Sequence, residues 1–378
     1  MIIIILLILV SCSESKKEND RFDDMDSGTF FENITIPEEV SVDINLDDIE
    51  YIEEAATYQA NYTEFDQQQL IDTLIQHDIV EENIWAEGPQ IIAAAPNIQE
   101  SLNIYDGGKA FGVETGMEGG FSYWNIINDI GYGEQQLVAS LSFDDTDQEF
   151  VLNSDYASYS DLDFLSYDDA LSDIKEVLDK VGMPPLEIDE TYSLDVETMR
   201  SHYELYLNSI FVEEKDKNIN WTKDHEAYIF SMQQLVDGIP IVNRGWLRPD
   251  GAKDAAFGNE MPVTTINLGY DQSGIRYISV YGILEVNDAN ETNRLITIYE
   301  ALETLIDAYS LTIIEDDLSI NSAKLSYLII PKDDGFELIP GWMFRSVRST
   351  LINDHTFNQY KYDVVHAVTG ELYEGRWN

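Results

Sequence analysis

Side chains able to carry out catalysis are scattered along this chain of 378 residues and form no known motif. The chain contains no HExxH motif, no HxH pair and no GxSxG nucleophile pattern. Zinc catalysis needs ligands at such spacings with one open coordination position, and a serine nucleophile needs its sharp strand-to-helix turn. We therefore expect ordinary surface or packed residues at the histidines and assign no catalytic, cofactor-binding or metal-binding residue. The histidines are His77, His202, His225, His355 and His366.

The 72 Asp and Glu residues outnumber the 21 Lys and Arg residues and give a net charge of −51. Nucleic-acid binding and direct docking on anionic lipid both need clustered Lys and Arg, so this charge argues against both. Two carboxylates could serve a glycosidase, although so many acids make incidental pairs common. The acidic clusters at 144–147 and 315–317 lack the spacing of a Ca²⁺-binding DxDxDG loop, and we interpret them as solvated loops.

The amino terminus has the pattern of an export signal. Residues 2–10 are an unbroken apolar run, too short to span a roughly 30 Å hydrocarbon layer as a helix but typical of a signal-peptide core. The run ends in Leu9-Val10-Ser11-Cys12, a polar stretch follows, and Cys12 is the only cysteine. This segment resembles the lipobox of bacterial lipoproteins, in which the cysteine is diacylated and the preceding peptide is removed. The resemblance implies lipidation of Cys12.

Lipidation would place the rest of the chain on the outer face of the cytoplasmic membrane of a bacterium. Residues 1–11 would be the signal peptide, and 12–35 the lipidated cysteine with an acidic linker. Seven carboxylates and few large apolar residues between 13 and 35 predict an extended, self-repelling tether. A hydrophobic fraction of 44% shows that the remainder can bury a core.

Residues 36–164 are predicted to form an amino-terminal helix followed by a glycine-rich β region. The helical pattern covers 37–87 and is clearest at Leu70, Leu74 and the neighbouring isoleucines, with Thr63 and Asp66 as possible caps. From Gly88 to Phe164, frequent glycines separate short apolar and aromatic stretches, which predicts short strands joined by glycine turns.

The second half predicts the same supersecondary unit twice, at 165–250 and at 251–378. Ser166 precedes a helical pattern with Asp169 at its third position, and Thr297 precedes another with Glu300 there. Each helix is followed by segments typical of antiparallel strands, and a further helical pattern from 195 to 211 lies inside the first unit. In that unit, the segment 236–241 predicts the end of a strand, a turn at Asp237-Gly238 and a returning strand. This order predicts an α+β fold in which antiparallel sheets are each covered by a helix.

Four segments of the second half carry a family resemblance. They are Thr297-x-x-Glu300-Ala301-Leu302, the strand 325–328, the segment 339–344 and the closing segment 366–371. These segments are similar to PepSY-like domains and to the carboxy-terminal units of YycH/YycI-type envelope regulators, and the whole chain resembles an uncharacterised group of lipoproteins from Gram-positive bacteria. The resemblance implies two related PepSY/YycI-like units and a noncatalytic accessory or regulatory role.

Together these observations predict a membrane-anchored extracellular lipoprotein with a noncatalytic binding or regulatory role at the cell envelope. Its partners would be the membrane, through diacylglycerol on Cys12, and an envelope protein or peptide, with no nucleic acid and no cofactor. A cationic partner would suit the net charge. Two alternatives stay open, which are a carboxylate-dependent cell-wall or glycan hydrolase and a solute-binding lipoprotein.

Overall fold

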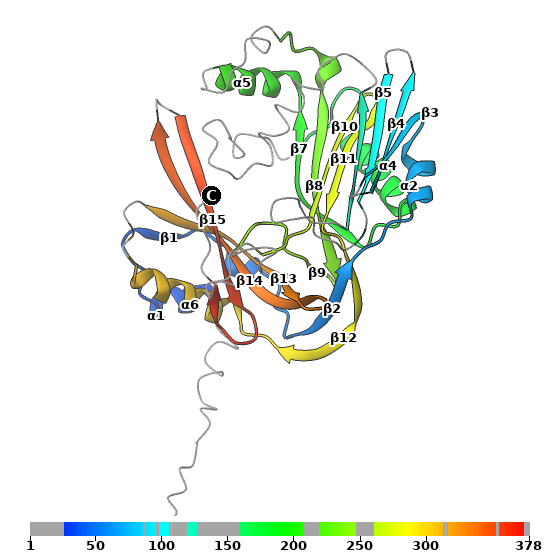
Figure 1. Ribbon diagram of the computed structural model, residues 1–378. Helices are drawn as coiled ribbons and strands as arrows, with labels where there is room; N and C mark the ends of the chain where they lie inside the picture. The colour runs from blue at the N-terminus through cyan, green and yellow to red at the C-terminus, as the bar shows by residue number, and fades with distance from the viewer. Residues whose placement is uncertain are drawn as a thin grey trace, which may run out of the picture.

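The computed structural model contains two β-sheets, each with helices on one face (Figure 1). It describes residues 26–85, 88–95, 98–105, 107, 119–126, 159–207, 219–246, 261–312, 314, 317–352 and 355–373. The expected signal peptide, Cys12 and most of the expected linker lie outside these residues, as does the acidic cluster 144–147. The expected α+β class is confirmed at the level of sheets covered by helices.

Sheet A joins strands from both ends of the chain. Its central order is β1-β13-β14-β15-β16, and β2 pairs with β14 and β12. All pairs are antiparallel except β1 with β13. The strands are β1 (Val40–Val42), β2 (Glu54–Tyr62), β12 (Leu284–Arg294), β13 (Leu318–Lys332), β14 (Gly335–Ile352), β15 (His355–His366) and β16 (Leu372–Tyr373).

Helix α6 (Ile298–Ser310) covers sheet A and begins at the predicted cap. The Thr297 hydroxyl accepts a hydrogen bond from the Glu300 amide, and the Glu300 carboxylate accepts one from the Thr297 amide, which completes a capping box. Leu302, Leu305 and Ile306 on its apolar face are fully buried. Helix α1 (Ser27–Asn33) lies beside α6 (Figure 1).

Sheet B has the order β3-β4-β5-β6-β11-β10-β8-β7, with the short β9 beside β8, and every pair is antiparallel. Its strands are β3 (Ile79–Trp85), β4 (Gly88–Ala95), β5 (Ile98–Ile104), β6 (Phe121–Ile126), β7 (Leu186–Leu194), β8 (Ala227–Val236), β9 (Ile239–Pro240), β10 (Thr265–Asp271) and β11 (Gly274–Tyr281). Strands are thus present in the expected β region at β4, β5 and β6, whereas most of the glycines expected in its turns lie outside the described residues.

Helices α2 (Gln67–Leu74) and α4 (Tyr167–Lys180) pack side by side on one face of sheet B (Figure 1). Ser166 caps α4 as predicted, because its side chain accepts a hydrogen bond from the Asp169 amide. Ile174 and Leu178 are buried against the sheet. The other helical segments among the described residues are α5 (Val196–Leu207) and two 3-10 turns, Leu46–Asp48 and Lys223–His225.

The predicted turn between β8 and β9 is confirmed. Asp237 and Gly238 have φ angles of 49° and 82°, so both central residues are left-handed, as a tight hairpin turn requires. After this turn the chain crosses to sheet A, where Ile241 forms a parallel bridge with Tyr327 of β13. Ile241 and Val242 are buried in the core of sheet A, so the two sheets are packed together through this segment.

Two expectations for the amino-terminal third are wrong. The helical pattern at 37–87 is a helix only at α2, where Asp66 caps the first turn, and β2 and β3 flank this helix. Pairing with β12 and β14 decides the conformation of β2, and such partners are not visible in local periodicity. Residues 27–33 of the expected linker are helical, because Phe30 is buried with its ring 5.2 Å from that of Tyr299.

In the part of the chain that the structure describes, no helix combines the length and the apolar character needed to cross a bilayer.

Candidate functional site

A cavity opens between the ends of α2 and α4 and the face of sheet B that these helices cover. Its volume is about 250 Å³, close to the lower limit of common small-molecule pockets. Residues from six segments line it, which are Thr73, Leu74 and Gln76 at the end of α2, Asp173, Glu176, Val177 and Lys180 of α4, Tyr123 and Asn125 of β6, Tyr270 of β10, Ser273 of the next turn, and Gly274 and Ile275 of β11.

A buried carboxylate anchors the sheet side of this cavity. Glu100 of β5 is fully buried and accepts hydrogen bonds from the Tyr123 hydroxyl at 2.6 Å and from the Gln76 amide at 3.1 Å. His77 Nδ1 lies 2.7 Å from the second carboxylate oxygen, Oε2. Burial, and then the neighbouring Glu100, raise the pKa of Tyr123, so this phenol stays protonated and keeps donating. The chain segment after α2 is thereby fixed to the sheet.

The carboxylates at the rim belong to α4. Asp173 and Glu176 are three residues apart on this helix, so their side chains lie on one face. Tyr270 donates a hydrogen bond of 2.7 Å to Asp173 Oδ2, and burial followed by this contact raises the pKa of the tyrosine. Lys180 lies 2.6 Å from Glu176 Oε1 and holds the pKa of that carboxyl below its usual range. The rim thus carries two carboxylates and one ammonium group.

Asn125 is the residue of the cavity whose bonding is incomplete. It is 2% exposed, it lines the cavity from β6, and its buried Oδ1 accepts no hydrogen bond from any described residue. A buried acceptor without a donor costs roughly 1–3 kcal/mol compared with one that is hydrogen-bonded. The cavity therefore offers one unsatisfied acceptor at its floor and carboxylates at its rim, which is a lining that suits a ligand with N–H donors and positive charge.

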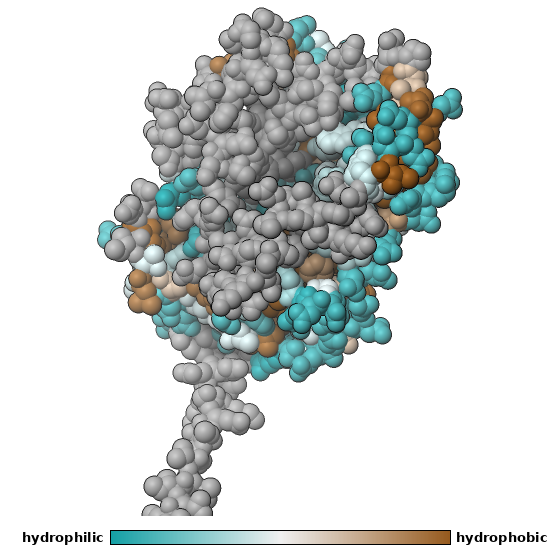
Figure 2. All heavy atoms as spheres, viewed as in Figure 1, coloured by the Kyte–Doolittle hydropathy of each residue, from teal (hydrophilic) through white to brown (hydrophobic). Residues whose placement is uncertain are grey.

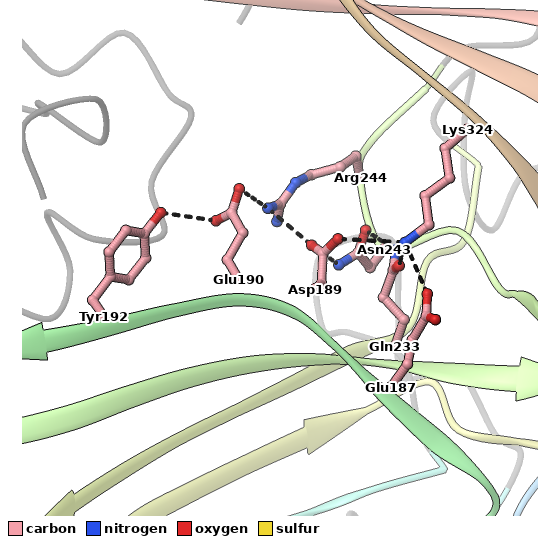
Figure 3. A network of polar contacts seen from close by, with 8 residues as sticks. All are labelled: Glu187, Asp189, Glu190, Tyr192, Gln233, Asn243, Arg244 and Lys324. Carbon is pink, nitrogen blue, oxygen red and sulfur yellow. Dashed lines mark hydrogen bonds and ion pairs between the residues drawn. The ribbon is translucent and has the colours of Figure 1, made fainter. Parts of the chain in front are cut away.

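A second polar cluster lies where the two sheets meet (Figure 3). Lys324 of β13 binds Glu187 of β7 at 2.8 Å and donates to Gln233 Oε1 of β8 at 2.5 Å, so its side chain crosses from sheet A to sheet B. Arg244 lies 3.3 Å from Asp189 and 3.0 Å from Glu190, both on β7.

The remaining members of this cluster connect the two ion pairs. Asn243 donates to Asp189 and accepts from Gln233, and Tyr192 donates to Glu190 (Figure 3). Each side chain of the cluster therefore has a protein partner. We interpret the cluster as a tie that holds the sheets in register, and the cavity under α4 as the candidate binding site.

The structure places the residues singled out in the sequence in different surroundings. Cys12 lies outside the described residues, as do the side chains of His202 and His355. His77 joins the Glu100 cluster behind the cavity. His225 is buried, with its Nδ1 3.1 Å from the Thr222 hydroxyl, and His366 lies at the end of β15. Among the described residues, no three His, Cys, Asp or Glu side chains form a group suited to a metal ion.

Sequence reasoning did not identify the residues of the cavity. One usable signal exists for Glu100, which shares the inward face of β5 with Leu102 and Ile104, since alternate residues of a strand lie on the same face. A carboxylate on an apolar face marks a buried polar site. Asn125 offers a similar signal, because it shares its face with Phe121 and Tyr123 in β6. Neither pattern indicates that α2 and α4 enclose a space above these strands.

Comparisons with known proteins identify a fold but no family. No family model matches the chain, and no curated protein matches it. The crystal structure of an uncharacterised protein from Eubacterium rectale ATCC 33656 is similar over 90% of this chain and 92% of that chain, with a TM-score of 0.55 and 15% sequence identity. This similarity supports the overall arrangement of the two sheets across nearly the whole chain.

Proposed function

We propose that this protein is a bacterial lipoprotein, anchored by diacylglycerol on Cys12 at the outer face of the cytoplasmic membrane, whose folded body binds a ligand and does not convert it. The lipobox-like segment before Cys12 supports the anchor. The cavity between α2, α4 and sheet B supports the binding role. The observation that carries the proposal is the buried, unsatisfied Oδ1 of Asn125 at the floor of that cavity.

The ligand is a small molecule or terminal group with N–H donors and positive charge. Asn125 Oδ1 requires a donor, and Asp173 and Glu176 outweigh the single ammonium group of Lys180 at the rim. A cation would gain attraction from both carboxylates, and an anion would meet repulsion from them. The net charge of −51 also attracts a positively charged ligand at long range.

The contacts of the rim carboxylates favour binding over hydrolysis. Asp173 accepts the hydrogen bond of Tyr270, and Glu176 is paired with Lys180. A glycosidase needs one carboxyl with a raised pKa as the proton donor. Burial raises the pKa of Glu226, but this residue does not line the cavity.

We also propose that the segments beginning at α4 and α6 are related PepSY/YycI-like units. Each has a helix capped by Ser166 or Thr297 that covers an antiparallel sheet. In addition, a tyrosine–aspartate hydrogen bond joins each of these helices to the sheet that it covers, from Tyr270 of β10 to Asp173 of α4 and from Tyr309 of α6 to Asp363 of β15. A shared ancestry would explain the shared plan, with the hydroxyl on the strand in one unit and on the helix in the other.

Binding is tested by titrating the folded body, residues 26–378, with propylammonium, propionamide and propionate, which have similar size and different charge. At about −1.5 kcal/mol for each non-hydrogen atom at best, propylammonium can bind no tighter than about 40 μM, so the titration extends to millimolar concentration. We expect propylammonium to raise the melting temperature and to shift the NMR signal of the Asn125 side-chain amide. Propionamide should bind more weakly, and propionate should not bind.

The variant Asn125→Leu tests the observation on which the proposal depends, because it removes the unsatisfied acceptor and keeps the number and branching of the side-chain heavy atoms. We expect it to abolish the response to propylammonium and to raise the free energy of unfolding of the empty protein by about 1 kcal/mol. Asn103→Leu is the matched control, since Asn103 also has a buried Oδ1 without a partner but does not line the cavity. An undiminished propylammonium response in Asn125→Leu would refute the proposed site.

Anchoring is tested separately by expressing Cys12→Ala in a Gram-positive host. Two acyl chains hold a protein stably at a membrane, so loss of the cysteine should release it to the medium. Continued membrane retention of the variant would contradict lipidation at this residue.

A further inference from the structure

Strand β3 is an open edge of sheet B. It pairs with β4 and with no other described strand, so one row of its backbone N–H and C=O groups is not used in the sheet. The opposite edge strand, β7, is covered by Lys324 and Arg244 of the polar cluster between the sheets. The outer strands of sheet A are β1 and β16, which contain only three and two residues, and β12, which pairs only with β2 among the described strands. Strand β12 is bulged against β2, and its exposed side chains are polar or charged apart from Ala289. Among the described outer strands, β3 is therefore the long open edge that carries large apolar side chains.

The side chains of β3 are unusually apolar for an exposed edge. Ile79, Val80, Ile84 and Trp85 are 47%, 56%, 80% and 36% exposed. Figure 2 shows the corresponding brown surface at the upper right, over β3 and β4. Soluble proteins normally protect such an edge with charges, proline or a covering segment, because it can accept another strand. Exposed apolar side chains next to free backbone groups are the features of a strand-addition site.

The charges on β3 indicate which strand would fit. Glu81 and Glu82 stand at the middle of the strand, and residues 79–95, which include β3 and β4, contain no Lys or Arg. Directly opposite positions of paired strands favour opposite charges and disfavour like charges. Glu81 and Glu82 are consecutive in the strand, so their side chains lie on opposite faces of the sheet. A fitting segment is therefore extended and apolar at alternate positions, with a Lys or Arg opposite at least one of the two carboxylates.

A second copy of this chain does not meet that requirement. In an antiparallel pair of two full-length β3 strands, Glu82 would face Glu82 of the other copy, because it is the middle residue of Ile79–Trp85. In an in-register parallel pair, Glu81 and Glu82 would each face the same residue of the other copy. Both arrangements bring like charges together, so homotypic pairing is disfavoured.

We infer that β3 is a docking edge for an extended, cationic segment of another protein, which adds to sheet B as a further strand. The site is separate from the cavity under α4, and it supplies a protein-binding surface in addition to the proposed small-ligand site. The backbone groups of β3 would provide affinity, Ile84 and Trp85 would provide apolar contacts, and Glu81 and Glu82 would select a basic partner.

The inference is tested with a short capped peptide of alternating threonine and valine that has lysine at its centre. Its binding to residues 26–378 is measured by fluorescence anisotropy, and the site is located by hydrogen exchange. We expect slowed exchange confined to 79–85 and at least about fivefold weaker binding when the central lysine is replaced by glutamate. N-methylation of alternate peptide amides should abolish binding, because strand addition requires those donors.

The double variant Glu81→Gln/Glu82→Gln should lose most of the preference for lysine over glutamate. The control Asp333→Asn/Asp334→Asn changes the net charge equally in an exposed turn of sheet A and should keep the preference. Equal binding of both peptides to the unmodified protein, or slowed exchange outside 79–85, would overturn the inference. Concentration-dependent dimerisation that is lost in Ile84→Lys would also overturn it, in favour of a second copy as the occupant.

Discussion

The two sheets contain comparable polar clusters beneath their covering helices, and the two clusters differ in completeness. Under α6, Tyr309 donates to the buried Asp363 at 2.5 Å and lies 2.9 Å from the Ser346 hydroxyl. Lys361 completes this cluster at 2.9 Å from the other carboxylate oxygen of Asp363. Helix α6, strands β14 and β15 and one charge pair thus form a closed polar group.

Under α4 the corresponding group is open. Tyr270 donates to Asp173, but this carboxylate is exposed at the rim of a cavity of about 250 Å³, and no described residue donates to Oδ1 of Asn125 at the floor. Closed polar groups add rigidity, whereas an open one retains bonding capacity for a ligand. This difference supports the proposal that the helix–sheet region under α4 binds a ligand, whereas the closed cluster under α6 contributes to stability.

Breaking the closed cluster should have the largest effect. Lys361→Met leaves the fully buried Asp363 without its cation, and the free energy of unfolding should fall by about 3 kcal/mol in urea denaturation. Lys332→Met is the matched control, because Lys332 pairs with Glu337 at 2.7 Å but is 47% exposed, and it should cost less than about 1 kcal/mol. Equal losses in the two variants would contradict the distinction between closed and exposed pairs.

The two tyrosines allow a direct comparison of the units. Tyr309→Phe removes a donor to a buried carboxylate and should lower the free energy of unfolding by about 2 kcal/mol. Tyr270→Phe removes the same group from the exposed Asp173, where water can replace it, so the loss should be no more than about 1 kcal/mol. Both values come from urea denaturation without ligand. The reverse order would show that the cluster under α4 is the more tightly closed one.

Local sequence signals predicted the starts of both helices and the hairpin after β8 but not this difference. The caps at Ser166 and Thr297 and the turn at Asp237 and Gly238 each depend on residues within a few positions of one another. These features could therefore be identified without knowledge of the fold, and the structure confirms them.

Contacts between segments far apart in the chain determine the conformation of β2 and the presence of the cavity, which could not be predicted from the sequence. The conformation of β2 depends on partners more than 200 residues away, in β12 and β14. The cavity requires α2, α4 and strands from two separate parts of the chain to meet, and nothing in the sequence near Asn125 specifies that no described residue donates to its Oδ1. Whether every group of a polar cluster is hydrogen-bonded depends on the assembled fold. The similar helix patterns after Ser166 and Thr297 therefore could not predict that one cluster is closed and the other open.

The smallest predicted effect concerns the pH dependence of the closed unit. Burial lowers the pKa of His366 below its ordinary value of 6.5, and its Nδ1 accepts a hydrogen bond of 3.1 Å from the Val368 amide, which protonation of that nitrogen would break. The unfolded chain then takes up a proton at higher pH than the folded one, so this residue lowers stability as pH falls below 6.5. Urea denaturation of the natural protein and of His366→Asn at about pH 7.5 and about pH 5.5 measures the effect. Because asparagine keeps an acceptor but does not titrate, the variant should lose less stability on acidification, whereas an identical loss in both proteins would place the pH sensitivity elsewhere.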